Sequence, residues 1–193
     1  MGVVMLSRGR SLAQALENIL MMTVGEFIER YRDLLPRFTM ISETETLEKV
    51  LEHIYNGYHY IVVTDHRGRV RGVVYHLDLI YSIGHPHFEQ IPALLNILHF
   101  RRRIKVPIDV LLKTPVDEIM RRTPPCIKED KLVSDSVDLM HKVHRSYVIV
   151  MSKSDEVRGI VTAHSILRAA LRESGSPIDV RTHAHHSAEL SPT

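Results

Sequence analysis

The chain has 193 residues, of which 44% are hydrophobic and 25% are charged, the balance of a soluble globular protein that needs no metal or disulfide to fold. Its net charge of +2 does not indicate a nucleic-acid partner, and its one cysteine, Cys126, excludes an intramolecular disulfide framework and fits a reducing cytosol. The chain lacks a secretory signal and any stretch of roughly 20 apolar residues, so we expect a cytoplasmic protein without membrane association.

The first 83 residues contain an N-terminal extension and one unit of mixed helices and strands. We predict a helical extension over residues 1–21 and a first unit over 22–83. Helical spacing of apolar residues alternates there with β-branched and aromatic runs. The predicted order is helix, strand, helix, strand, strand and helix, at residues 23–31, 38–41, 47–54, 58–63, 69–75 and 76–83.

Residues 84–112 form a connector after the first unit. Its apolar residues follow helical spacing, as at Ile91, Leu94 and Leu98, and arginines occupy positions 101–103. Two interpretations stay open. The segment is either a helix whose basic end complements its own dipole, or a docking surface for a partner or an anionic ligand.

The second unit, residues 113–173, repeats the order of the first. The stretch VRGIVTAHSIL at 157–167 matches VRGVVYHLDLI at 70–80. Helices are predicted at 115–120 and from 132 and 162, and strands at 125–127, 147–151 and 157–161. One such unit is marginal alone. We therefore predict an α/β sandwich in which two units, each a small sheet with packed helices, bury each other's sheets about a pseudo-twofold axis.

The duplicated order, with a Gly-apolar-apolar-x-x-x-Asp type signature at each final strand-to-helix turn, resembles the CBS domain, and the chain resembles a tandem CBS pair. The resemblance implies a three-stranded sheet in each unit and a homodimer. It further implies a regulatory module, not an enzyme, that requires no cofactor. Such a module binds an adenine nucleotide between its units, AMP first and ADP, ATP or S-adenosylmethionine as alternatives, and signals to a regulated partner by conformational change.

The two strand-to-helix turns are the predicted ligand sites. Free backbone N–H groups at the positive end of a helix dipole suit an anion. The glycines that permit close approach are Gly72 and Gly159. By resemblance, Asp78 holds a ribose at the first turn, where Tyr75 replaces the expected Thr or Ser. At the second turn Thr162 meets a phosphate, and Ser165 replaces the Asp. The alternatives are helix N-capping for the two hydroxyls and a solvated first-turn carboxylate for Asp78.

The resemblance also assigns phosphate contacts to His144 and Arg145, since nucleotide-sensing family members carry a Val-His-Arg at a similar place and arginine suits phosphate. The alternative is a surface pair at a helix end. Tyr58 and Tyr60 occupy the corresponding stretch of the first unit, as adenine contacts or as core. The first strand of each unit would line an adenine pocket or would be ordinary core. The residues concerned are Met40, Ile41, Cys126 and Ile127.

Catalytic and metal motifs are absent from the sequence. It contains no HExxH, CxxC or phosphate-loop pattern, and Cys126 has no recognisable nucleophile context. The His-x-His-His run at 183–186 lies in residues 174–193, a polar tail that we expect to be mobile, and a biological metal role there is not favoured. The rival hypothesis is a ligand-free dimeric adaptor that docks a protein or nucleic acid through the arginines of the connector.

Overall fold

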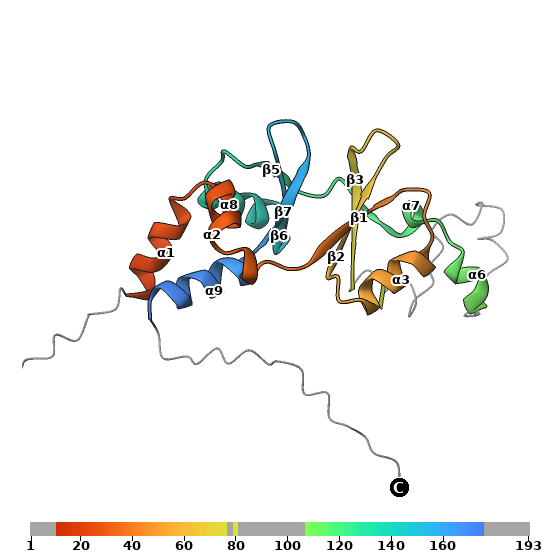
Figure 1. The fold of residues 1–193 in the computed structure, drawn as a ribbon, viewed down its shortest axis with the longest axis horizontal. Helices are drawn as coiled ribbons and strands as arrows, with labels where there is room; N and C mark the ends of the chain where they lie inside the picture. Colours follow the sequence, from red (N-terminus) through yellow and green to blue (C-terminus); the bar gives the residue numbers. More distant parts are fainter. Residues whose placement is uncertain (1–10, 77–78, 81–106, 176–193) are drawn as a thin grey trace, which may run out of the picture.

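The computed structural model describes residues 11–76, 79–80 and 107–175, which form two small sheets with helices packed around them (Figure 1). The strand order is β1-β2-β3-β4 in the first sheet and β5-β6-β7 in the second. The first sheet consists of β1 (Phe38–Ser42), β2 (Tyr60–Thr64), β3 (Val70–Tyr75) and β4 (Arg121–Arg122). The second consists of β5 (Cys126–Lys128), β6 (Tyr147–Met151) and β7 (Val157–Thr162).

Helices precede and follow the strands, and the sequence predicted them except for the 3-10 helix at 32–34 and the helix at 108–112. In the first half they are α1 (Leu12–Leu20), α2 (Val24–Arg30), the 3-10 helix η1 (Arg32–Leu34) and α3 (Leu47–Tyr55). In the second half they are α6 (Ile108–Leu112), α7 (Val116–Ile119), α8 (Val133–Lys142) and α9 (Ala163–Glu173). Residues 76 and 79–80 are also helical, whereas the rest of the helix predicted at 76–83 and the connector as far as residue 106 lie outside the described residues.

Both units have the same strand topology. In each, the first strand pairs parallel with the second, and the second and third form an antiparallel hairpin. The predicted order of the strands is therefore confirmed in both units. The sequence did not predict β4, which pairs antiparallel with β3 at Gly72 and Val73 and gives the first sheet four strands instead of three.

The central strands are buried on both faces, and their alternation explains how the two sheets meet. Ile61 and Val63 of β2 face the helices of the first unit, while Val62 between them faces the second sheet. Likewise, Ile149 of β6 packs between the sheets, and Val148 faces the helices of the second unit. The predicted mutual burial of the two sheets is therefore what the structure shows.

The first helix of each predicted unit packs on the other unit, an arrangement that we call the helix exchange. The residues of α2 join the core of β5–β7, α8 and α9, whereas α6 and α7 pack against α3 of the first unit. Figure 1 shows red α2 beside α8 and green α7 beside α3. Backbone hydrogen bonds fix both exchanges, from the Val24 amide to the Lys131 carbonyl at 2.7 Å and from the Val116 amide to the Glu45 carbonyl at 2.8 Å. Each unit is thus completed by a segment from the other half of the chain.

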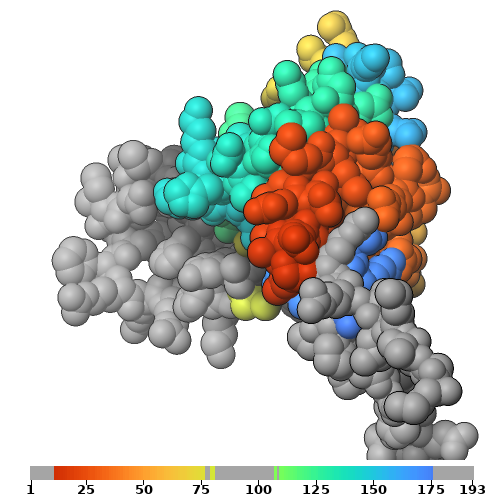
Figure 2. Space-filling model, turned by 90° about the vertical axis from the view of Figure 1, so that its left-hand side faces the viewer, coloured from red at the N-terminus to blue at the C-terminus, as the bar shows by residue number. Residues whose placement is uncertain are grey.

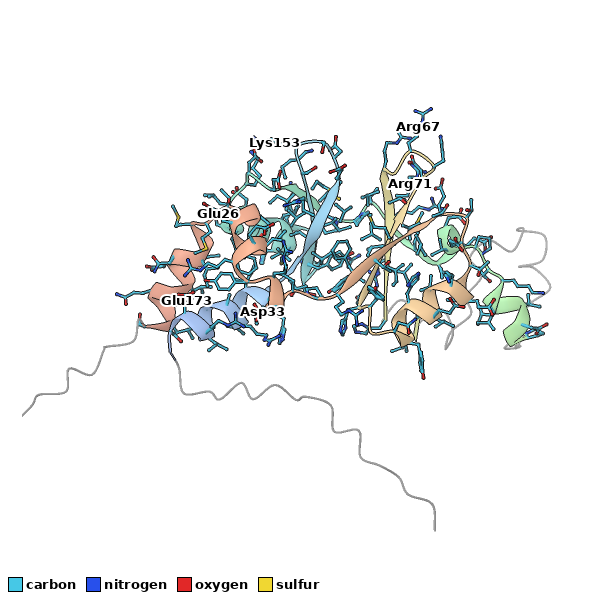
Figure 3. All side chains as sticks on the ribbon, in the orientation of Figure 1. Glu26, Asp33, Arg67, Arg71, Lys153 and Glu173 are labelled. Carbon is cyan, nitrogen blue, oxygen red and sulfur yellow. The ribbon has the colours of Figure 1, made fainter. Side chains whose placement is uncertain are left out.

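The exchanged helix α2 and the adjoining α1 lie against α8 and α9 (Figure 2). Both helices begin with a reciprocal capping box, formed by Ser11 with Gln14 and by Thr23 with Glu26. Polar contacts then tie the end of α2 and η1 to the end of α9. Figure 3 labels two of the residues involved, Glu173 and Asp33.

Tyr31 is the buried member of these contacts, 1% exposed, and its hydroxyl donates to Glu173 at 2.8 Å. Desolvation and this hydrogen bond raise the pKa of Tyr31 to about 12, so the phenol stays protonated and remains a donor. Arg30 also pairs with Glu173, at 3.0 Å, and Arg172 pairs with Asp33. The segment after α2 is therefore fixed on the second unit before the chain enters β1.

The turn of the first hairpin is organised by Asp65, whose side chain is 5% exposed. Its carboxylate accepts hydrogen bonds from the amides of Arg67 and Arg69, at 2.9 and 3.0 Å, and from Nε of Arg69 at 2.8 Å. Desolvation raises the pKa of Asp65, but the hydrogen bonds from Arg69 and Arg67 outweigh it and lower the pKa to about 2. Ser152 holds the matching place in the second hairpin, where its hydroxyl accepts from the Ser154 and Glu156 amides.

The depressed pKa of Asp65 predicts an acid-sensitive contribution to stability. The contribution should be fully present above about pH 4, the unfolded-state value, and should disappear as the pH falls toward about pH 2. We expect Asp65→Asn to lower the urea midpoint at neutral pH and to converge with the parent protein in acid. Urea unfolding across this range, with exposed Asp130→Asn as the control, checks it. Parallel acid profiles for the parent and Asp65→Asn would show the prediction to be wrong.

Candidate ligand site between the two units

A hollow of about 430 Å³ lies where the end of β3 meets the segment between α8 and β6. We call it the basic hollow. Its lining residues are Tyr75, Met140, His141, His144, Arg145, Ser146 and Tyr147. None of these is an aspartate or glutamate, so the lining has no carboxylate. Its side chains that can carry a positive charge are the guanidinium of Arg145 and the imidazoles of His141 and His144. Of the residues that the sequence assigned to a ligand, His144 and Arg145 come together here.

The backbone after α8 aims His144 and Arg145 into this hollow. The Arg145 amide donates to the Met140 carbonyl at 2.9 Å, which closes the chain back onto the helix. His144 has φ of 53°, in the left-handed region that favours glycine. The first unit has Gly57, with φ of 82°, at the matching place, because each residue stands three positions before a strand that starts at Tyr60 or Tyr147. A side chain in this conformation costs about 1 kcal/mol.

Tyr75 and Tyr147 line the basic hollow, and the ring of Tyr60 packs against both of them. The ring centroid of Tyr60 lies 6.0 Å from that of Tyr75 and 5.2 Å from that of Tyr147, and Tyr75 and Tyr147 are 6.1 Å apart. Arg121 of β4 lies over the Tyr75 ring at 5.5 Å. Burial raises the pKa of Tyr60 to about 12, so this phenol carries no charge near neutral pH. Tyr75 stands where the resemblance expects Thr or Ser, and it contributes an aromatic ring to the wall of the hollow.

A second hollow, of about 390 Å³, lies between the segment joining α2 to β1 and the start of β7. We call it the linker hollow. It is lined by Ile28, Glu29, Arg32, Leu35, Pro36, Arg37, Phe38, Tyr58, Arg158, Gly159 and Ile160. Two of its arginines are paired with carboxylates, Arg32 with Glu29 at 2.9 Å and Arg158 with Glu29 at 3.1 Å. The linker hollow thus brings Tyr58 and Gly159 together, apart from His144 and Arg145.

The polar groups of the second turn bond to each other. Thr162 is the N-cap of α9, and its hydroxyl oxygen accepts from the Ser165 amide at 3.0 Å. In return, the Thr162 amide donates to the Ser165 hydroxyl oxygen at 3.0 Å. The Ser165 side chain is 0% exposed and donates to the Thr162 carbonyl at 2.8 Å. The N-capping alternative for both residues is therefore present in the structure.

The repeated Val-Arg-Gly has a packing role in both units. Its arginine pairs with the glutamate that follows the first strand, Arg71 with Glu43 at 3.5 Å and Arg158 with Glu129 at 3.4 Å. Its glycine lies against the segment that comes from the other half of the chain, Met120 and Arg121 at Gly72 and Ile28 of α2 at Gly159. A Cβ at Gly72 would meet Met120 and the Arg121 carbonyl, and one at Gly159 would lie 3.1 Å from Cδ1 of Ile28. The sequence repeat therefore marks the helix exchange as well as the two turns.

The first strands contribute core and surface in alternation. Ile41 and Ile127 are 7% and 9% exposed and belong to the cores of the first and second units. Met40 is 53% exposed, and Cys126 is exposed with its thiol donating to the Pro124 carbonyl at 3.4 Å. Neighbouring atoms still desolvate this thiol and raise its pKa, which makes it a poorer nucleophile. Asp78 lies outside the described residues.

Sequence reasoning missed His141, Tyr75 and Tyr147 as lining residues. His141 could have been found, because it stands three positions before His144 and the two are the only histidines between residues 133 and 146. The tyrosines could not, since only the packing of the two sheets brings Tyr75 to Tyr147.

Within residues 11–76, 79–80 and 107–175, no group of three His, Cys, Asp or Glu side chains is arranged to hold a metal. In the same ranges, no helix combines the length and apolarity needed to span a membrane.

Comparison with known proteins supports the duplicated organisation. The CBS domain family model matches residues 28–85 and 116–172, which together make up more than half of the chain. A search of curated proteins gives no match.

Solved structures share the fold. CBSX2 in complex with AMP is 20% identical with a TM-score of 0.53, covering 78% of this chain and 96% of that one. The CBS domain pair of MJ0100, in complex with 5′-methylthioadenosine and S-adenosyl-L-methionine, is 20% identical with a TM-score of 0.52, covering 77% and 94%. The CBS-domain protein ATU1752 from Agrobacterium tumefaciens is 14% identical with a TM-score of 0.55, covering 78% and 94%.

Proposed function

The chain belongs to the CBS-domain family, and we propose that its two units form a regulatory module that binds an adenine nucleotide between them, with AMP as the first ligand to test. The ligands of similar structures support the class of compound. CBSX2 was solved with AMP, and the MJ0100 pair with 5′-methylthioadenosine and S-adenosyl-L-methionine. Binding, rather than turnover, is the proposed activity.

The basic hollow is the observation that carries the proposal. Arg145 presents a fork of donors suited to phosphate oxygens, and His144 stands beside it in a backbone conformation that favours glycine. Tyr75 comes from the first unit and Arg145 from the second, so a ligand here contacts both. Such a ligand favours whichever arrangement of the two units holds these groups together, and a partner protein can detect that arrangement.

We propose one strong site per chain, at the basic hollow. Asp78 stays the ribose contact that the family resemblance assigns, and it lies outside the described residues. At the second turn the hydroxyls of Thr162 and Ser165 already bond to each other, and Ser165 is fully buried. A nucleotide there would have to break this capping box and replace its hydrogen bonds. Calorimetric titration should therefore give a stoichiometry near one AMP per chain.

Arg145→Ala is the test of the phosphate contact. Because a hydrogen bond to a charged group contributes about 1.5 to 3 kcal/mol, we expect AMP affinity to fall about tenfold to a hundredfold. Isothermal calorimetry with AMP, ADP, ATP and S-adenosylmethionine measures it. The matched control is Arg67→Ala, labelled in Figure 3 at the tip of the first hairpin, because Arg67 does not line the basic hollow.

Two results would contradict the proposal. The first is no heat with any of the four compounds at high protein concentration, which would favour the ligand-free adaptor and its connector arginines, which lie outside the described residues. The second is an equal loss of affinity in Arg145→Ala and Arg67→Ala, which would place the ligand elsewhere. We propose that the module is a homodimer, and sedimentation of the free and AMP-bound protein tests this separately.

A further inference from the structure

A second histidine stands in the basic hollow beside the pair that the family resemblance assigns to phosphate. His141 lies in the last turn of α8, and its ring centroid is 6.4 Å from that of His144. Both imidazoles line the hollow together with the Arg145 guanidinium. A ligand anion in this space would therefore meet three cationic or potentially cationic groups at once.

The groups around the two imidazoles do not include a lining carboxylate. Tyr75 at the end of β3 and Tyr147 of β6 line the hollow with them, while the His76 ring lies 5.4 Å from the Tyr75 ring and Arg121 of β4 lies over it. On their own helix, Asp138 and Lys142 are the flanking charged residues, one of each sign. The lining itself thus gains positive charge when imidazoles gain protons.

We propose that His141 binds the ligand anion together with His144 and Arg145, and that the two imidazoles make the affinity of this site depend on pH. Histidine is the side chain that ordinarily changes charge between about pH 5 and pH 8. The formal charge on the lining rises from one to three as both imidazoles are protonated. An anion then binds more tightly in acid, and the gain is lost as the pH rises.

The backbone of His144 independently supports a role for its side chain. The first unit places Gly57 at the matching position, where the left-handed conformation has no steric cost. The second unit has a histidine there, in a conformation that is strained for any residue with a side chain. Residues held in such conformations cluster at ligand sites, because the side chain is needed where only that backbone can put it.

The inference rests on the basic hollow being the ligand site of the proposed function. The probe is adenosine 5′-sulfate, chosen because its charge does not change in the range where histidine titrates, with uncharged adenosine as the reference. We expect the dissociation constant of adenosine 5′-sulfate to be about tenfold lower at about pH 5.5 than at about pH 8, since two added charges act at short range in a solvated site. Adenosine should show almost no change.

Two substitutions remove the titrating groups and keep the backbone. His144→Asn suits the left-handed conformation, and His141→Gln suits a helix. The double variant should lose the pH dependence, each single variant should lose part of it, and His66→Asn at the first hairpin turn should behave like the parent. Thermal midpoints, measured at both pH values, test whether all variants are folded.

The outcomes separate this inference from the proposed function. A pH dependence unchanged in His141→Gln, or one that survives in the double variant, would overturn the inference while leaving nucleotide binding in place. If inorganic sulfate binds with the expected pH dependence but no adenosine compound does, the anion site stands and the nucleotide proposal fails. If no anion binds at about pH 5.5, both are wrong.

Discussion

Phe27→Ala is expected to lower the free energy of unfolding by about 3 to 5 kcal/mol, the range for removing a fully buried phenylalanine. Phe27 is 0% exposed and lies 5.0 Å, centroid to centroid, from the ring of Tyr31. It is the aromatic residue of α2 inside the core of the second unit, together with Val148 and Val161 of that unit. Alanine would leave a cavity between an exchanged helix and a sheet more than a hundred residues away in the chain.

Urea unfolding gives the size of this effect, and hydrogen exchange gives its location. Because α2 covers the second sheet, amides of Val148 and Val161 should lose protection before those of Val62 and Val74. The control is Tyr55→Ala at the end of α3, where the side chain is 92% exposed and the change should stay within about 0.5 kcal/mol. Earlier loss of protection in the first sheet would contradict the helix exchange.

Gly72→Ala is expected to cost about 2 to 3 kcal/mol, whereas Gly159→Ala should cost less than about 1 kcal/mol, although both alter the same Val-Arg-Gly repeat. A Cβ at Gly72 would lie 2.7 Å from Cγ of Met120, closer still to its sulfur, and 2.8 Å from the carbonyl oxygen of Arg121. The carbonyl belongs to β4, so relief requires a backbone shift. At Gly159 the nearest atom is the end of the Ile28 side chain, which can rotate away.

The two glycine variants serve as each other's control. They share sequence context, strand type and substitution, so a difference in urea midpoint reports only what approaches each glycine. We also expect Gly72→Ala to weaken the pairing of β4 with β3, seen as faster amide exchange at Arg121 and Arg122. Equal midpoints for the two variants would mean that the close approach of Met120 and β4 does not constrain Gly72.

Local features of the sequence determined most of the elements. β-branched runs predicted β2, β3, β6 and β7, and the repeat in the sequence predicted that both halves share one topology. Such local patterns can be read from neighbouring residues, because the alternation of buried and exposed residues in a strand and the spacing of apolar residues in a helix are both set within a single element. Of the candidate site, His144 and Arg145 were also predicted from the sequence, by resemblance to family members, and the structure places both in the lining of the basic hollow.

Only the tertiary structure decided which unit each helix covers and what surrounds the pair. The periodicity of α2 shows that one face is buried but not against which sheet, since any apolar surface of suitable shape would serve. Tyr75 and His141 are far apart in the chain, and the meeting of the two units makes them walls of one hollow. Thr162 and Ser165 suit a ligand and a helix cap equally well by residue type. Their reciprocal hydrogen bonds, which form only in the folded turn, place them in the cap.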